Sequence, residues 1–485
     1  MDVSLVSMYS NSATRPAPLP DAPPRRKGKT KMNKMTLAAA AILLAATASL
    51  AEEGAPAPAA VQDSSSAHGL PLRIYGDFRA RQEKWNFIPI PTAEPNITRG
   101  GYNNSFRYRT RLGAALDIAD NATVNLRLVN MVYNTTDGAD AFSWPDELSL
   151  DNANLELRGV TGEGSRLVLG RQDIILGSGR LVLEGTPLDA SRTTFFDGVF
   201  LHQPFDGAFS ADAFAIYNRD EDDLAIGHEH RKLRGYSPAV DGRDEAAAAI
   251  FLNGALLDGS LPGSLYYIWK HETSARNAAG ENVPNADIHT VGAIVRPKFT
   301  DRLTGELEYA RQFDPASDNG IDAALAFASI KYTAKGTTLT PYIGANIGYL
   351  SGDDPDSKRN EAFNPIFSRY PFLSELVVYC FDTEGAANWN NLIYPHLSAG
   401  LRSETGCALD LTAGTMRADE RNGAGGGRDR GDLYMAQFSF PIFAGFEGGR
   451  GKTAGHFRVE LFDPGDYYTS DRTAYYFRWE ILVSF

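Results

Sequence analysis

Arginine recurs at every second position in two short stretches of this 485-residue chain. Arg79 and Arg81 lie in the first stretch, and Arg107, Arg109 and Arg111 lie in the second. Because alternate side chains of a β-strand point to the same side, each stretch presents its guanidinium groups as a row. Rows of this kind attract ions of one sign and hydrogen-bond polar groups. The sequence therefore predicts two cationic strand faces, whose charges either bind other molecules or pair with carboxylates on neighbouring strands and stiffen the wall.

Catalytic and metal-binding patterns give weaker candidates. The eight histidines do not cluster, and no G-x-S-x-G, H-E-x-x-H or C-x-x-C motif occurs. His228 and His230 form an H-x-H pair, while Asp353, Asp354 and Asp356 lie close together without the spacing of an EF-hand. A solvated loop explains both groups better than a metal site does. We therefore expect the protein to bind no metal or cofactor and to have no enzymatic activity. The formal net charge of −13 argues against nucleic acid as a partner.

The arginine rows require strands with two different faces. Arg107, Arg109 and Arg111 share one face with Asp117, whereas Leu112 and its even-numbered apolar neighbours share the other. A soluble sheet and a membrane barrel both alternate in this way. In a barrel, an arginine that faces lipid at mid-membrane costs about 2–4 kcal/mol. The arginine rows of a barrel must therefore face its aqueous lumen.

The connections between strands decide between these two architectures. The chain contains about 18 segments of strand length, and short, turn-rich connections alternate with long polar ones. The short connections include residues 119–122, 161–164, 203–207, 258–263, 297–301, 334–337 and 403–406, and the long ones include residues 86–104, 134–147, 174–191, 219–244, 273–286, 351–390 and 417–430. This alternation is typical of bacterial outer-membrane barrels. We predict an all-β fold, a closed antiparallel transmembrane β-barrel with short periplasmic turns and long extracellular loops.

Both ends of the chain favour export to the bacterial outer membrane. Residues 1–51 read as an N-terminal extension and a signal peptide cleaved after Ala51, with a single anchoring helix as the alternative. Residues 52–70 read as a flexible periplasmic lead-in, and residues 71–485 as the barrel. The last stretch alternates aromatic and polar residues and ends at Phe485. This ending resembles the signal by which the barrel assembly machinery recognises outer-membrane proteins.

The long connection 351–390 is unusually apolar for a loop in water. We expect it to act as a lid that folds inward or packs on the rim, although its aromatic residues could instead stack on sugar rings. The lid candidates are Asp353, Asp354, Phe363, Phe367 and Tyr370. Cys380 lies in this loop and Cys407 follows a periplasmic turn, so we expect them to be too far apart for a disulfide.

Two patches resemble the alginate-export family of outer-membrane barrels. The first is R-L-V-L-G-R-Q-D-I-I-L-G-S-G-R-L near Gly170, Arg171 and Gln172, and the second is H-F-R-V-E-L-F-D-P-G-D-Y-Y from His456 to Tyr468. The resemblance implies an 18-stranded monomer whose narrow, arginine-rich lumen passes an acidic polysaccharide outwards. It carries over to Arg111 and Arg458 as cationic lumen positions. Asp173 and His456 stand where the family usually has arginine, which lowers the positive potential expected here.

These observations lead to one functional hypothesis and two alternatives. We predict an outer-membrane channel that passes an anionic or oligosaccharide-like solute, and that exports polysaccharide if the resemblance holds. A general or substrate-selective uptake porin on the same barrel is the alternative, and an outer-membrane barrel enzyme is a further one. The expected partners are outer-membrane lipid, the barrel assembly machinery and the solute, with the protein as a monomer. The predicted pore-lining residues are Arg79, Arg81, Arg107, Arg109, Arg111, Arg127, Arg171, Asp173, His456, Arg458, Glu460 and Arg478.

Overall fold

The computed structural model describes most of the chain beyond residue 70. The described residues are 71–86, 89, 103–135, 148–184, 196–205, 207–219, 224, 240–241, 243–257, 259–277, 282–316, 320–335, 338–368, 372–377, 389–443 and 451–485. They belong to one compact unit, Thr47–Phe485. The predicted signal peptide and lead-in, His228, His230, Tyr370 and Cys380 lie outside the described residues, so the expectations about them stay predictions.

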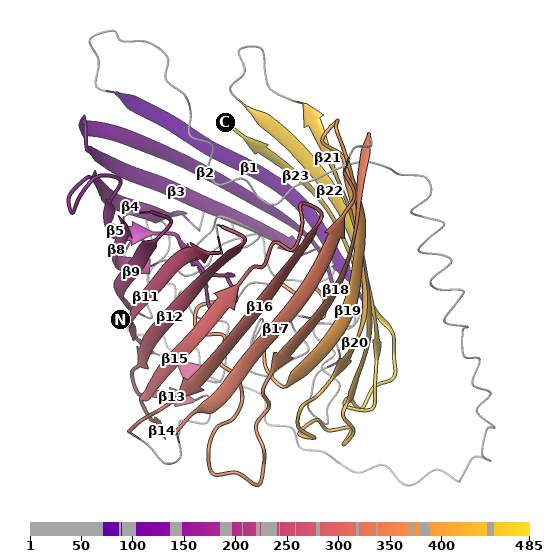
Figure 1. Cartoon of the computed structure of the whole chain (residues 1–485). Coiled ribbons are helices and arrows are strands. Elements are labelled where there is room, and N and C mark those ends of the chain that lie inside the picture. Colours follow the sequence, from indigo (N-terminus) through magenta and orange to yellow (C-terminus); the bar gives the residue numbers. More distant parts are fainter. Residues whose placement is uncertain are drawn as a thin grey trace, which may run out of the picture. The chain divides into compact units, whose positions relative to one another are not determined.

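The described residues form one large antiparallel sheet and two small ones (Figure 1). The large sheet has 18 strands: β1 (Leu72–Trp85), β2 (Asn103–Ala119), β3 (Ala122–Thr135), β4 (Leu148–Arg158), β5 (Arg166–Gln172), β8 (Phe196–Pro204), β9 (Ser210–Asn218), β11 (Glu245–Leu256), β12 (Leu261–Glu272), β15 (Ala286–Val295), β16 (Leu303–Phe313), β17 (Asp322–Thr333), β18 (Leu339–Leu350), β19 (Leu392–Ser403), β20 (Ala408–Arg417), β21 (Asp429–Phe443), β22 (Lys452–Pro464) and β23 (Ala474–Ser484). The short strands β6 (Ile174–Leu176) and β7 (Val182–Glu184) form a hairpin, and β10 (Val240–Asp241), β13 (Ala275–Asn277) and β14 (Asn282–Val283) form a small sheet.

The large sheet closes into a barrel because its first and last strands pair. Each long strand pairs antiparallel with the next one in the chain, and β1 lies beside β23 in Figure 1. Their register runs from Asp77 opposite Ser484 to Trp85 opposite Tyr476. Phe485 continues this pairing, since its backbone N–H and C=O both bond Gly76 at 3.0 Å. The structure confirms the predicted closed antiparallel barrel of 18 strands.

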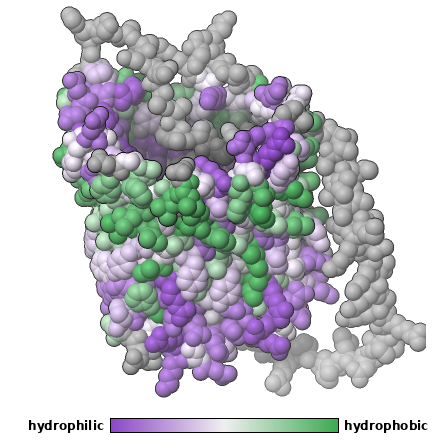
Figure 2. All heavy atoms as spheres, in the orientation of Figure 1, coloured by the Kyte–Doolittle hydropathy of each residue, from purple (hydrophilic) through white to green (hydrophobic). Residues whose placement is uncertain are grey.

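The two faces of each strand differ in the way that the sequence pattern predicts. On β1 and β2, Phe78 is 44% exposed and Leu112 is 50% exposed, whereas Arg79 and Arg109 are each 1% exposed. Apolar side chains therefore point out of the barrel and charged ones point in. In Figure 2 the outward apolar residues gather in a band between hydrophilic regions. No helix in the described part of the chain is long and apolar enough to cross a membrane.

The connections alternate in length around the barrel. The turn between β2 and β3 spans residues 120–121 and that between β11 and β12 spans residues 257–260, whereas residues 219–244 join β9 to β11 and residues 351–391 join β18 to β19. The connections at the end of the barrel where β1 begins and β23 ends have two to eight residues. Those at the other end have eight to 41 residues. The two ends of the barrel are therefore built differently, as the sequence predicts.

Candidate functional site in the barrel interior

The arginine rows of β1 and β2 lie side by side on the inner face of the barrel. Arg79 stands directly opposite Arg109, and Arg81 stands directly opposite Arg107. Like charges placed opposite each other on neighbouring strands destabilise a sheet. The four arginines are nevertheless buried or half-buried, and Arg81 is only 2% exposed. Carboxylates must therefore lie close by to compensate for the repulsion.

Asp77 and Glu480 supply part of this compensation. Asp77 accepts a hydrogen bond from Arg109 at 3.1 Å and also pairs with Arg111. Glu480, on β23, lies 3.7 Å from the Nε atom of Arg79. The contacts of Asp77 are hydrogen bonds between guanidinium and carboxylate groups, which are among the strong ones in proteins, whereas Glu480 and Arg79 form an ion pair. These contacts hold the arginines of neighbouring strands in fixed positions.

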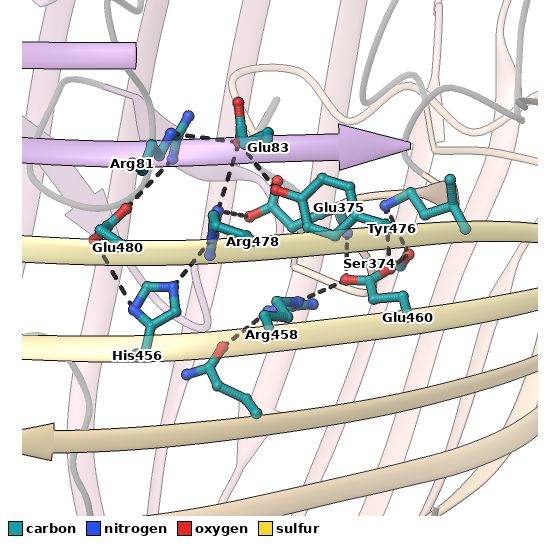
Figure 3. A network of polar contacts seen from close by, with 12 residues as sticks. Arg81, Glu83, Ser374, Glu375, His456, Arg458, Glu460, Tyr476, Arg478 and Glu480 are labelled. Atoms are coloured by element: carbon teal, nitrogen blue, oxygen red, sulfur yellow. Dashed lines mark hydrogen bonds and ion pairs between the residues drawn. The ribbon is translucent and has the colours of Figure 1, made fainter. Parts of the chain in front are cut away.

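Glu83, near the C-terminal end of β1, binds the arginines at that end of the two rows, Arg81 and Arg107. Its carboxylate lies 2.9 Å from Arg107, 3.3 Å from Arg81 and 3.9 Å from Arg478. The Tyr476 hydroxyl also donates to it at 2.9 Å. Figure 3 shows Glu83 and Arg81 on β1 facing Arg478 on β23. The cationic row thus continues across the closing seam of the barrel.

Strands β22 and β23 extend the row with a histidine and two arginines (Figure 3). Arg458 donates from Nε to Glu460 at 2.6 Å. Arg478 donates from Nε to the Nε2 atom of His456 at 3.0 Å, and the other ring nitrogen of His456 lies 4.0 Å from Glu480. An imidazole nitrogen that accepts a hydrogen bond carries no proton. His456 therefore acts here as a neutral partner of Arg478.

We call this continuous inner surface the arginine wall. Its described members on β1, β2, β22 and β23 are Arg79, Arg81, Arg107, Arg109, Arg111, Arg458, Arg478, His456, Asp77, Glu83, Glu460 and Glu480. The seven arginines outnumber the four carboxylates among these residues. The wall is therefore cationic although the chain as a whole is acidic. Nine of the predicted pore-lining residues come together in it.

The loop between β18 and β19 attaches to this wall from inside the barrel. Glu460, which is fully buried, accepts the Ser374 hydroxyl and the backbone N–H groups of Glu375 at 3.0 Å and Leu376 at 3.1 Å. The Glu375 carboxylate in turn lies 2.7 Å from Arg478. A loop residue thus adds a fifth carboxylate to the arginine wall, and sequence reasoning did not single it out.

The same loop also contacts the far side of the barrel. Phe367 is fully buried, and its ring centroid lies 5.3 Å from that of Phe196 on β8 and 6.4 Å from that of Phe214 on β9. Lys270 on β12 donates to the Ile366 carbonyl at 3.1 Å. Strands β9 and β22 stand on opposite sides of the ring, because β11 to β21 lie between them in one direction and β23 to β8 in the other. Phe367 and Ser374 of one loop therefore contact opposite sides of the barrel.

The remaining described lid candidates pack against the barrel or bond the backbone of their own loop. Phe363 is 2% exposed and packs in the same apolar cluster as Phe367. Asp353 accepts the backbone N–H of Glu361 at 2.8 Å, and Asp354 accepts that of Asp356 at 2.9 Å. These two aspartates therefore shape the loop itself. Within the described ranges, no group of three or more His, Cys, Asp or Glu side chains is arranged to hold a metal ion.

Arg127, Arg171 and Asp173 form a separate group farther along the sheet. Arg127 on β3 lies 2.7 Å from Asp151 and 2.8 Å from Asp173. Arg171 on β5 lies 2.7 Å from Asp197 and donates to the Leu150 carbonyl at 3.0 Å. Asp173, which departs from the alginate-export pattern, is thus a partner of Arg127. Charges in this group pair with one another across neighbouring strands.

Sequence reasoning missed Arg180, a cation in the turn between β6 and β7. It follows the β6 strand and binds Glu306 at 2.8 Å and Glu308 at 2.7 Å on β16. Its guanidinium carbon also lies 3.6 Å from the centre of the Phe327 ring. Arg180 falls within residues 174–191, which the sequence pattern predicts to be a polar loop. The alternation of β16 did mark both glutamates as inward-facing, but no signal pointed to their partner.

Comparisons with known proteins add evidence on the fold. No protein-family model matches the chain, and no curated protein matches it in sequence. Three similar crystal structures are those of Pseudomonas aeruginosa OccK5 (OpdH) and OccK2 (OpdF) and of Acinetobacter baumannii OccAB4, each with a TM-score of 0.50. In that order they are 14%, 11% and 13% identical to this chain in sequence. The alignments span 85%, 86% and 85% of this chain and 97% of each of the other three chains. The likeness shows a shared barrel fold, and none of these three is described as an alginate exporter.

Proposed function

We propose that this protein is a substrate-selective channel of the bacterial outer membrane that takes up small solutes carrying a carboxylate. The fold supports the location, since the barrel matches outer-membrane porin structures and has an outward apolar band (Figure 2). The end with the short turns and both barrel termini would face the periplasm, as in bacterial barrels generally. Outer-membrane lipid, the barrel assembly machinery and a monomeric state belong to the same proposal.

The arginine wall is the observation that carries the solute class. Its guanidinium groups lie in a row from β2 across β1 to β23 and β22, and they outnumber the carboxylates beside them. A row of cations along one side of a lumen draws anions and passes them from site to site. Guanidinium also matches the planar carboxylate group better than it matches a neutral hydroxyl. A small organic anion is therefore the solute that this surface fits best.

The β18–β19 loop favours a small solute over a polymer. It contacts β9 and β12 near Phe367 and β22 near Ser374, so it is attached to opposite sides of the interior. A polysaccharide chain would have to displace contacts on both sides at once, whereas a small anion at the arginine wall would displace contacts on one side only. Uptake of a small solute therefore fits the interior better than the export of an acidic polysaccharide.

The proposal is tested by single-channel recording of the purified protein in planar lipid bilayers. Gluconate, a monocarboxylate, is compared with sorbitol, which has a similar carbon skeleton without the charge, and with a short polyuronate. We expect an anion-selective current that gluconate reduces at lower concentration than sorbitol does. A channel that prefers cations, or that sorbitol and gluconate reduce equally, would contradict the proposal. Tight block by the polyuronate alone would revive the exporter hypothesis.

A further inference from the structure

We propose that Glu375 is a built-in competitor for the solute, and that its carboxylate occupies the place on Arg478 where the carboxylate of the solute binds. This inference rests on the proposed function and assigns one site within the arginine wall. The site consists of Arg478, His456 and the loop segment around Glu375 (Figure 3). Its ligand class is a small monocarboxylate.

Arg478 lies near the carboxylates of Glu83 and Glu375, and these two residues are held in different ways. Glu83 lies 3.9 Å away on a neighbouring strand and has closer contacts with Arg107 and Arg81. Glu375 lies only 2.7 Å away and belongs to a loop. A strand residue is held by the ladder on both sides, whereas a loop side chain can turn away without disturbing a ladder. Glu375 is therefore the partner of Arg478 that a solute can replace.

The attachment of the loop does not depend on the Glu375 side chain. Glu460 binds the Ser374 hydroxyl and two backbone N–H groups, and none of these bonds involves the Glu375 carboxylate. The Glu375 side chain is 12% exposed, compared with 4% for Arg478 and 0% for Glu460. The loop can stay bound to β22 while this carboxylate leaves Arg478.

Exchange of one carboxylate for another keeps the charge of Arg478 compensated, while the displaced Glu375 carboxylate turns away from it into the lumen. A solute monocarboxylate that replaces Glu375 gives Arg478 a partner of the same charge and shape, so no buried guanidinium is left without compensation. A neutral sugar cannot supply that compensation and leaves Glu375 in place. The competitor thus selects against neutral solutes, and it weakens the binding of the correct solute enough to allow its release.

The substitution Glu375→Gln tests this inference because it removes the charge and keeps the shape. If the tethered carboxylate occupies Arg478 about nine-tenths of the time, its removal tightens the apparent affinity for a solute about tenfold. We therefore expect gluconate to block the E375Q channel at about one-tenth of the concentration that blocks the wild type. Block by sorbitol should not change. Glu375→Asp keeps the charge with a shorter reach and should give an intermediate value.

Glu361→Gln is the matched control, since Glu361 lies in the same loop and contacts Ser357 rather than the arginine wall. Its gluconate block should equal that of the wild type. In an R478Q background, Glu375→Gln should no longer change the block. Correct folding of each variant is checked by its heat-dependent mobility in gel electrophoresis.

Two results would overturn the inference, and they differ in what they imply for the proposed function. If gluconate blocks wild type and E375Q at the same concentration, Glu375 is not a competitor, while the selective channel stands. If gluconate blocks neither protein and neither prefers anions, both the inference and the proposed function fail.

Discussion

Lys270 is the most deeply buried cation on the side of the barrel opposite the arginine wall. Its side chain is 0% exposed and lies 2.9 Å from Glu245 and 2.7 Å from Glu272. Its ammonium nitrogen also lies 4.9 Å from the centre of the Phe367 ring. A buried ion pair gives little net stability compared with apolar residues, but the loss of one partner leaves an uncompensated charge. Loss of Lys270 should therefore destabilise the barrel mainly because the buried carboxylates of Glu245 and Glu272 would lose their compensating charge.

We predict that Lys270→Met destabilises the folded barrel by about 3–5 kcal/mol. Urea-induced unfolding in phospholipid vesicles measures this change. Lys335→Met is the control, because Lys335 forms an exposed pair with Asp301 at 3.6 Å and such pairs contribute little. Equal effects of the two substitutions would show that burial of the Lys270 cluster has no energetic consequence.

Glu460 is the anchor for the β18–β19 loop, and its charge should decide whether the loop stays in place. Glu460→Gln weakens three hydrogen bonds to the loop and removes the charge that Arg458 binds. Hydrogen bonds to a charged group contribute about 1.5–3 kcal/mol each. We expect the conductance of the open channel to rise in planar bilayers. A conductance equal to that of the wild type would mean that the loop holds its position without this anchor.

The sequence predicts the direction of some side chains in the site but not all of their contacts. The inward direction of Arg79 and Arg109 follows from alternation together with the cost of placing arginine in lipid. The contact between Glu375 and Arg478 joins residues more than a hundred positions apart through a loop without periodicity. Neither alternation nor charge pattern specifies where such a loop lies. The sequence could therefore predict the wall but not its loop partner.

The strands give a prediction that depends on depth in the membrane. Leu112 lies near the middle of β2 and Ile118 lies near its end beside the short turn, and both side chains point outward. Arginine on the lipid-facing side costs about 2–4 kcal/mol at the bilayer midplane and about 0–1 kcal/mol near the interface. Leu112→Arg should therefore destabilise the barrel far more than Ile118→Arg. Urea-induced unfolding in vesicles measures the stability of both variants. Equal destabilisation would contradict the placement of Leu112 near the bilayer midplane and Ile118 near the interface.

Strands were predictable and the structure inside the loops was not. Alternation marks β1, β2 and β23 clearly, because lipid and the barrel interior select opposite residue types on the two faces. The β6–β7 hairpin lies in a segment that reads as a polar loop, and each of its strands has only three residues. A pattern with a period of two needs a longer segment than this to be recognised.

At the scale of the whole molecule, closure and the inner loop act together. The pairing of β1 with β23 brings Arg79 and Arg81 into one surface with Arg478, although about 400 residues separate them in the sequence. The β18–β19 loop then reaches that surface from the far wall. The alginate-export resemblance predicts an arginine-rich lumen, but it does not account for a loop attached to opposite sides of the interior. Under the proposed function, the assembled barrel and not any one motif sets the size of the solute that passes.

If the proposed function is correct, the arginine wall sets the ion preference of the channel. The most direct test replaces Arg107, Arg109 and Arg111 together with Gln and measures the reversal potential in a potassium chloride gradient across a planar bilayer. The control replaces the exposed Lys298, Arg302 and Lys335, which removes the same charge at the short-turn end. We predict that the wild type and the control prefer chloride, and that the wall variant loses this preference because Asp77 and Glu83 remain. An unchanged reversal potential in the wall variant would contradict the account.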